Sequence, residues 1–265
     1  MTAPTADPAR VAAARRRLLA QGVEILGEDH LLLGISKAAG VLSQPGPAGE
    51  ISLVELVDAY RREAEGKAGH AFVGLVHRLD RNVSGAMVVA KTSKAASRLS
   101  EAFRTRVGVE KTYLAWTAGS PAKDADTLRS VLVRDLLRRV TQARPAPTPA
   151  ADEAAGTDGE DAADGEASVA TLDYVVEARG PRGCRLRVRL HTGQTHQIRA
   201  QLAREGLPLL GDVKYGGPAG PRPALHARRL VVPHPVTREP VIVDAPVPDD
   251  LRRLDRDLGL RPAAD

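Results

Sequence analysis

The sequence predicts an α+β fold, in which strands and helices follow one another without the regular alternation of a parallel α/β protein. Residues 110–119 and 184–191 alternate apolar with polar side chains, the pattern of a strand with one buried face. Residues 52–64 and 93–106 carry apolar side chains at helical spacing. Proline turns separate short strands near the C-terminus, and no repeated strand–helix–strand unit emerges.

Length and composition limit the class of protein. The 265 residues suit one large domain or two small ones. Aromatic residues make up 3% of the chain and hydrophobic residues 43%, so the core is expected to be mostly aliphatic. A single cysteine, Cys184, excludes an internal disulfide and a cysteine metal cluster, and it favours a reduced, cytoplasmic compartment. No apolar run reaches the roughly 20 residues of a membrane span, and the N-terminus lacks the apolar core of a secretory signal.

The charge is distributed unevenly. The formal net charge is +5, but residues 145–168 hold seven acidic residues and no lysine or arginine. The rest of the chain therefore has 38 basic against 26 acidic residues. So basic a folded part suggests a polyanionic partner such as nucleic acid, although ordinary solubility charge gives the same composition.

The acidic segment at about 145–168 contains no aliphatic side chain larger than alanine. It cannot bury enough apolar surface to offset the entropy cost of ordering, so we expect a disordered acidic insertion. Periodic sequence resumes on both sides, which favours a long loop inside one domain. A linker between two domains is the alternative.

The first half of the chain is expected to contain two strands and two helices after a flexible tail or short helix at residues 1–22. Residues 31–35 form a short apolar run and predict a strand. Ser52 followed by Glu55 predicts a capping box at the start of the helix at 52–64. After an expected tight turn at Ser84-Gly85, residues 85–92 predict a buried strand. The apolar side of the helix at 93–106 is expected to consist of Ala95, Leu99, Ala102 and Phe103.

The second half is expected to contain two clear strands and one helix. In the strand at 110–119, Lys111 and Tyr113 share one face, and Trp116 lies on the other. In the strand at 184–191, one face is apolar and the other carries Arg185, Arg187, Arg189 and His191. A turn and a helix follow, with Thr195 as candidate N-cap and Gly206 at the C′ position.

Several classes of site find no support in the sequence. The glycine spacing matches neither a phosphate-binding P-loop nor a dinucleotide fingerprint, and no zinc-protease or serine-hydrolase motif occurs. His191 and His196 are five residues apart without accompanying acids, so no metal site is expected. What remains is "HRLDRNVSG" at residues 77–85, in which Asp80 stands between Arg78 and Arg81.

A carboxylate near arginine stays ionised at neutral pH, which suits a nucleophile or an electrostatic stabiliser better than a general acid. A surface salt bridge gives the same local pattern. Tyr113 and Arg199 are compatible with a site around Asp80, but local spacing does not bring the three segments together and leaves both interpretations open.

A resemblance decides between them. The segments "ILGEDHLLLGISKAAGVLSQPG", "HRLDRNVSGAMVVAKT", "EKTYLAW", "LHTGQTHQIRAQLAREGLPLLGDVKYGG" and "LHARRLVVPHPVTREP" occur in this order. Together they resemble the RluA-type family of RNA pseudouridine synthases from about residue 23 to residue 248, interrupted only by the acidic insertion. The chain departs from the usual pattern at Ala38 (usually proline), Val83 (threonine), Gln194 (arginine) and Gln201 (histidine). The two glutamines are expected to weaken RNA contacts or alter the choice of target.

The resemblance implies a reaction and roles for residues. A uridine is flipped out of folded RNA, its N1–C1′ bond is broken, the uracil turns, and a C5–C1′ bond forms, with no cofactor and no metal. Asp80 would be the nucleophile, Tyr113 would lie against the uracil, and Arg199 would pair with Asp80. Arg78 would fill the space left by the flipped base. The expected RNA-binding set is completed by Arg81, Arg185, Arg187, Arg189, Gln194 and His196.

Each role has a plainer alternative. Arg78 would otherwise be a phosphate contact, Tyr113 an ordinary strand aromatic, and Arg199 the partner of another acid. The arginine face of the strand at 184–191 would otherwise be solvated.

The resemblance also implies a catalytic domain over residues 23–265, with a mixed, largely antiparallel sheet, flanking helices and a central RNA-binding cleft. About twenty residues precede the expected first strand, so we expect no S4-type RNA-binding domain of the kind that many relatives carry. We expect a monomer that binds ribosomal or transfer RNA and no membrane. The alternative is a catalytically inactive RNA-binding or ribosome-assembly protein on the same fold. A phosphodiester-cleaving enzyme would need a metal cluster or paired histidines.

Overall fold

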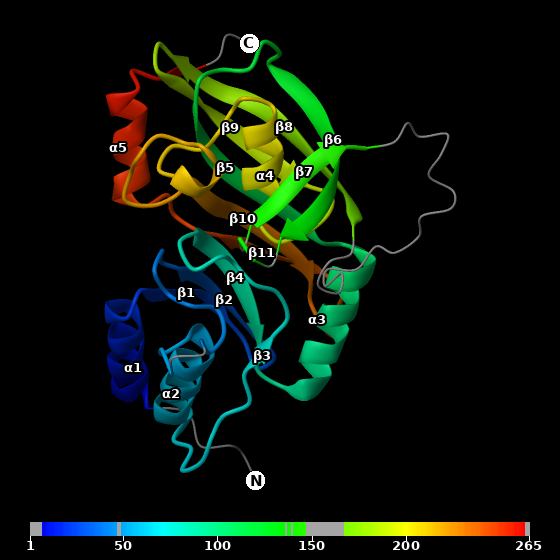
Figure 1. The fold of residues 1–265 in the computed structure, drawn as a ribbon. Coiled ribbons are helices and arrows are strands. Elements are labelled where there is room, and N and C mark those ends of the chain that lie inside the picture. Colours follow the sequence, from blue (N-terminus) through cyan, green and yellow to red (C-terminus); the bar gives the residue numbers. More distant parts are fainter. Residues whose placement is uncertain (1–6, 47–48, 136, 139, 147–166, 263–265) are drawn as a thin grey trace. The chain divides into compact units, whose positions relative to one another are not determined.

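The structure, a computed structural model, describes residues 7–46, 49–135, 137–138, 140–146 and 167–262. The chain divides into two compact units (Figure 1). Unit 1 comprises Met1–Val109 and Ala227–Pro246, and unit 2 comprises Glu110–His226 and Val247–Asp265. The architecture is mixed α+β with largely antiparallel strand pairing, which confirms the predicted fold class. The acidic segment that we expect to be disordered lies, for residues 147–166, outside the described residues.

Unit 1 is built on antiparallel strands. Pairing runs from β1 to β2 to β4, β3 pairs with β4, β10 lies beside β4, and β11 pairs with β10. Its elements are α1 (Pro8–Ala20), β1 (Val23–Glu28), β2 (Leu32–Lys37), α2 (Leu53–Glu65), β3 (Gly74–Leu75), β4 (Ser84–Ala90), α3 (Ser93–Thr105), most of β10 (Leu225–Pro233) and β11 (Pro240–Asp244).

Local sequence pattern accounts for these elements. The buried residues of α3 are the predicted four, and three of them, Ala95, Leu99 and Phe103, pack with β4, β10 and β11 into one largely aliphatic core. At the start of α2, the Glu55 carboxylate accepts the backbone N–H of Ser52 at 2.6 Å, as the capping-box pattern predicts. The N-terminal helix α1 is capped by Asp7 and buries Ala14 and Leu18.

The tight turn predicted at Ser84-Gly85 is wrong, because these two residues begin β4. The turn lies earlier, where the Val83 N–H donates to the Asp80 carbonyl at 3.0 Å. Gly85 is required for a different reason. Its φ is +132°, and a Cβ there would lie 2.2 Å from the carbonyl oxygen of Ala227 in β10, so only glycine lets the two strands approach.

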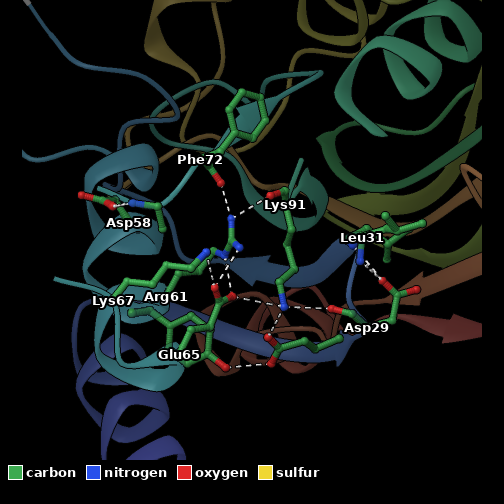
Figure 2. Close-up of polar contacts among 12 residues, drawn as sticks. Asp29, Leu31, Asp58, Arg61, Glu65, Lys67, Phe72 and Lys91 are labelled. Atoms are coloured by element: carbon green, nitrogen blue, oxygen red, sulfur yellow. Dashed lines mark hydrogen bonds and ion pairs between the residues drawn. The ribbon is translucent and has the colours of Figure 1, made fainter. Parts of the chain in front are cut away.

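A network of largely buried charges holds α2 to the sheet of unit 1 (Figure 2). The guanidinium of Arg61 donates to both carboxylate oxygens of Glu65, at 2.8 and 3.0 Å. It also donates to the carbonyls of Phe72 and Lys91. Burial alone would raise the pKa of Glu65, but hydrogen bonds from Arg61 and Lys67 outweigh burial and lower that pKa to about 2.

Lys91, directly after β4, links this pair to the turn between β1 and β2. Its ammonium donates to the Asp29 carbonyl at 2.8 Å and to the Glu28 carboxylate at 2.9 Å. Glu28 also accepts the Tyr60 hydroxyl at 2.7 Å, and burial together with this bond raises the pKa of Tyr60 to about 12. The carboxylate of Asp29 accepts the backbone N–H groups of Leu31 and of Leu32, the first residue of β2.

Unit 2 is an antiparallel sheet in which β5 pairs with β9, β9 with β8, β8 with β6, and β6 with β7. Its elements are β5 (Glu110–Ala118), β6 (Ala125–Asp135), β7 (Val140–Pro145), β8 (Ser168–Gly180), β9 (Gly183–Leu190), α4 (Gln197–Arg204), the 3₁₀ helix η2 (Val213–Tyr215), α5 (Asp249–Asp257) and β12 (Arg261–Pro262).

The two faces of this sheet are covered by different helices. Ala200 of α4 packs with Leu132 of β6 and Ala170 of β8 on one face. On the other face, Leu251 and Leu258, at and just beyond α5, pack with Leu114 and Trp116 of β5.

Helix α5 was not predicted from the sequence, although its pattern is helical. Two aspartates stand in its first turn and an arginine in its last, as the helix dipole favours, and leucines recur at spacings of three and four.

Removing the central arginine of the unit 1 network tests its contribution to stability. Arg61→Ala is expected to lower the free energy of unfolding by about 3 kcal/mol, because it leaves carbonyls and a carboxylate in a largely buried place without their donor. Arg62→Ala is the matched control on the same helix. Its side chain is 43% exposed and its Nε lies 3.8 Å from the Asp58 carboxylate, so a loss of about 0–1 kcal/mol is expected. Urea unfolding measures both.

The pH dependence gives a second readout on the same pair of proteins. Glu65 has a lowered pKa in the folded chain, so its contribution is present above its ordinary pKa of 4.5 and is lost as the pH falls toward about 2. The difference in the free energy of unfolding between wild type and Arg61→Ala should therefore shrink as the pH falls over that range. Equal losses for the two arginine variants, or a difference that does not change with pH, would contradict the proposed importance of the network.

Candidate active site

The segment 77–83 lies between β3 and β4 and carries both buried and exposed side chains. Leu79 and Val83 are buried and anchor the segment in unit 1. Arg78 and Arg81 are exposed, and Asp80 is half-buried between them. The segment therefore carries a half-buried aspartate that stands in the sequence between two exposed arginines.

The backbone after Asp80 is fixed by the end of β2. The carbonyl of Arg81 accepts the N–H of Gly40 at 2.8 Å and the ammonium of Lys37 at 3.2 Å. The side chain of Lys37 is fully buried, and its ammonium also donates to the carbonyls of Ala38 at 3.0 Å and Val41 at 2.9 Å. A buried ammonium is tolerated here because carbonyl oxygens surround it.

The backbone before Asp80 is fixed by the segment that follows β2. The hydroxyl of Ser43 donates to the Leu79 carbonyl at 2.7 Å and accepts the Leu79 N–H at 3.2 Å. Next to it, the Gln44 side chain accepts a hydrogen bond from Arg78 at 3.1 Å. The segment from Lys37 to Gln44 therefore contacts the candidate loop on both sides of the aspartate.

The other charged residue of the loop, Arg81, is held through its side chain as well. Its guanidinium donates to the Gly40 carbonyl at 3.2 Å and to the Glu50 carboxylate at 2.8 Å. At the start of the loop, His77 stacks on Phe103 with ring centroids 4.6 Å apart, and its Nε2 accepts the backbone N–H of Val88. These contacts give His77 a structural role in holding the start of the loop.

Tyr113 of β5 lies on the face of the unit 2 sheet that α4 covers. It stands directly opposite Val188, which stands opposite Tyr174, and residues opposite one another share a face. Tyr174 and Ala170 share that face, and Ala170 packs against Ala200 of α4. The side chain of Tyr113 is half-buried.

Arg199 of α4 is buried and is held by an acid that the sequence analysis did not single out. Its Nε and Nη2 donate to the two carboxylate oxygens of Asp212 at 2.7 and 2.8 Å. Asp212 is 1% exposed and precedes η2. The guanidinium also lies over the ring of Tyr215, 4.8 Å from its centroid. This geometry fixes the direction of the guanidinium by two parallel hydrogen bonds.

The predicted N-cap at Thr195 is wrong. Helix α4 begins at Gln197, and the preceding residue, His196, has a left-handed φ of 57°. That conformation brings His196 Nδ1 within 2.8 Å of the Tyr215 hydroxyl, which also accepts the Thr141 N–H at 2.8 Å. At the other end, Gly206 has a φ of +73°, consistent with the predicted C′ position.

The two glutamines that depart from the usual pattern have different surroundings. Gln201 is buried at 1% exposure, and its amide donates to the carbonyls of Leu128 and Ala170. The expectation that Gln201 affects RNA contacts is therefore wrong for direct contact, because its side chain lies inside unit 2. Gln194 is half-buried, and its backbone N–H is held by the Gln197 side chain at 3.1 Å.

The arginines of β9 project from the face opposite Tyr113. Arg187 stands opposite Leu114, and Arg185 stands opposite Trp116, both of which pack with α5 residues. All three arginines have acidic partners among the described residues, which are Glu177 and Asp255 for Arg185, Glu177 for Arg187, and Glu110 for Arg189.

Asp80 belongs to unit 1, whereas Tyr113 and Arg199 belong to unit 2. Within unit 2, Tyr113 and the helix that carries Arg199 are on one face of the sheet. The pairing of Asp80 with Arg199 stays a prediction.

The residues that sequence reasoning missed are Lys37, Ser43, Asp212 and Tyr215. The last two lie in "GDVKYGG", a segment whose residues had been noted without an assigned role. Nowhere in the described ranges do three or more histidine, cysteine, aspartate or glutamate side chains gather so that they could hold a metal ion. Of the described helices, none is long and apolar enough to cross a membrane.

Comparison with known proteins gives a consistent result. The family model for RNA pseudouridylate synthase matches residues 32–204. A Bacillus subtilis protein described as the uncharacterized RNA pseudouridine synthase YhcT is 32% identical over 236 residues, covering 88% of this chain and 72% of that protein. The ribosomal large subunit pseudouridine synthase D of Xanthomonas campestris is 34% identical over 250 residues, covering 88% and 68%. Among solved structures, Human RNA Pseudouridylate Synthase Domain Containing 4 matches with a TM-score of 0.74 at 23% identity, covering 97% of this chain and 99% of that one, which shows a shared fold.

Tyr215→Phe tests the hydrogen bonds that hold the start of α4. The substitution removes the acceptor of the buried Thr141 N–H and the partner of His196, so the free energy of unfolding should fall by about 1–3 kcal/mol. Hydrogen exchange should accelerate at the Thr141 amide, whereas the Val188 amide in the β5–β9 pairing serves as the control and should keep its protection. Unchanged exchange at Thr141 would show that the tyrosine hydroxyl does not hold this strand.

Proposed function

The chain belongs to the RNA pseudouridylate synthase family, whose members are isomerases that convert uridine in RNA to pseudouridine, and we propose that it modifies ribosomal RNA of the large subunit with Asp80 as the nucleophile. The names of relatives support this substrate, since several matched proteins are described as ribosomal large subunit pseudouridine synthase D. Transfer RNA is the alternative substrate. Pseudouridine mapping of total RNA from cells with and without this gene distinguishes the two, and signal lost only from transfer RNA contradicts the proposal.

One observation carries the role of Asp80. Asp80 is half-buried on a loop whose backbone is held on both sides, and the nearest exposed residue on each side of it in the sequence is an arginine. In the proposed reaction a uridine leaves the RNA stack, and Asp80 starts the breakage of the N1–C1′ bond. The freed uracil turns, C5 bonds to C1′, and the proton on C5 is lost to restore the ring. Arg78 occupies the space that the flipped base leaves.

The two residues of unit 2 complete the proposed machinery. Tyr113 lies against the uracil ring and helps to remove the C5 proton. Arg199 pairs with Asp80, and its bidentate bond with Asp212 supports this role by orienting the guanidinium. Arg81, Gln194 and His196 contact the RNA around the flipped base.

Asp80→Asn is the direct test of the nucleophile. The substitution keeps the size of the side chain but removes its charge and nucleophilic oxygen, so pseudouridine formation should vanish within detection. RNA binding should persist or tighten, because one repelling charge is lost. The matched control is Asp124→Asn, which makes the same change in an exposed ion pair with Arg179, where an effect of about 0–1 kcal/mol on stability and none on turnover is expected.

The measurements are pseudouridine formation on large-subunit ribosomal RNA, RNA affinity, and circular dichroism to verify folding. Turnover by Asp80→Asn at more than a few per cent of wild type would remove Asp80 from the mechanism. Such turnover would also favour the alternative that residues outside this loop perform the chemistry. A wild-type protein that binds RNA but makes no pseudouridine would instead favour the alternative of a non-catalytic RNA-binding protein.

Salt dependence distinguishes the arginines of the two units. Arg78→Gln should flatten the slope of log affinity against log salt by about one on any substrate, because Arg78 stands beside the proposed pocket. Arg187→Gln and Arg189→Gln should each flatten this slope only when the substrate is a long RNA, since these residues face away from Tyr113. A short stem-loop that holds the target uridine is the comparison. An unchanged slope on both RNAs would assign the arginine face of β9 to solvent.

A further inference from the structure

We propose that Ser43 is a positioning residue for the aspartate of the candidate site, a role that rests on the proposed function of Asp80. The geometry that points to this role is a pair of hydrogen bonds between the serine hydroxyl and the backbone of one residue. One hydroxyl donates to the carbonyl of Leu79 at 2.7 Å and accepts the N–H of the same residue at 3.2 Å. Serine can do both at once because its hydroxyl has one donor and two acceptor positions.

The bond to the Leu79 carbonyl matters most for Asp80. That carbonyl belongs to the peptide group whose nitrogen is the nitrogen of Asp80. Ser43 therefore fixes the plane of the peptide group directly before the aspartate. On the other side, the Asp80 carbonyl accepts the Val83 N–H at 3.0 Å, which fixes the peptide group directly after it. With both planes held, the direction of the Cα–Cβ bond of Asp80 is defined.

Ser43 is itself held firmly enough for this task. Its side chain is buried at 5% exposure, so water does not compete for the two bonds. The preceding residue, Leu42, forms a parallel bridge with Ser52, and its carbonyl accepts the Leu53 N–H at 2.7 Å. The first turn of α2 thereby anchors the segment that carries Ser43. Through Ser43, the position of Asp80 is tied to this helix.

The test compares Ser43→Ala with Ser43→Thr, which keeps the hydroxyl. Small displacements of a reacting group are costly, so Ser43→Ala should lower kcat by about tenfold to a hundredfold. KM and RNA affinity should stay within about twofold, because the exposed arginines that face RNA keep their charge. Ser43→Thr should recover most of the lost kcat. Leu99→Ala, in the core of the same unit, controls for lost stability, because it removes packing in α3 and should leave kcat nearly unchanged below its unfolding temperature.

Hydrogen exchange gives a readout that does not depend on activity. The Leu79 amide should be protected in wild type and in Ser43→Thr and should exchange faster in Ser43→Ala. Unchanged exchange in Ser43→Ala, or a folded Ser43→Thr that is as slow as Ser43→Ala, would overturn the role of the hydroxyl. If wild type makes no pseudouridine, or Asp80→Asn keeps its turnover, the proposed function fails, and the exchange measurement still decides whether Ser43 fixes the loop.

Discussion

The position of one half-buried carboxylate depends on hydrogen bonds that its own side chain does not make. The peptide groups around Asp80 are held by Ser43 on one side and by Lys37 and Gly40 on the other. The contact made by Lys37 carries the greatest free-energy cost, since burying an ammonium is unfavourable unless polar groups surround it. Three backbone carbonyls meet this requirement, and one of them belongs to the loop itself. The loop and the buried charge therefore stabilise each other.

The ion-pair network of unit 1 acts at the opposite end of the same two strands. Strand β2 begins just after Asp29 and ends at Lys37, and β4 begins just after the candidate loop and ends just before Lys91. The two strands pair in register from Leu32 with Ala90 to Lys37 with Gly85. The ion pairs of Lys91 therefore hold one end of this strand pair, and the hydrogen bonds from Lys37 to backbone carbonyls hold the other end. A shift of register would disturb both sets together, which gives the pairing its specificity.

The elements that the sequence predicted well are those defined by local periodicity. The apolar residues of α3 and the alternation of β9 need only neighbouring residues to be recognised, and both were confirmed. The partners of polar side chains were not predictable in this way. Asp212 meets Arg199 across a loop, and Ser43 meets Leu79 from 36 residues away, so only the tertiary structure brings them together. His196, the residue directly before α4, has a left-handed backbone conformation, which the prediction of Thr195 as N-cap did not include. The roles of Asp80, Tyr113 and Arg199 came from resemblance, since spacing alone could not relate the segments.

The pairing of β6 with both β7 and β8 has a consequence for protein engineering. Pro145 at the end of β7 stands opposite Ser130, and Ser168 at the start of β8 stands opposite Leu132. The chain thus leaves and rejoins the sheet on the two sides of one strand, at points about two strand spacings, or roughly 10 Å, apart. A fused reporter domain whose termini lie close together could span this distance without pulling on the register of the sheet. The junction between β7 and β8 is therefore a natural place to build a tagged or split form of the enzyme.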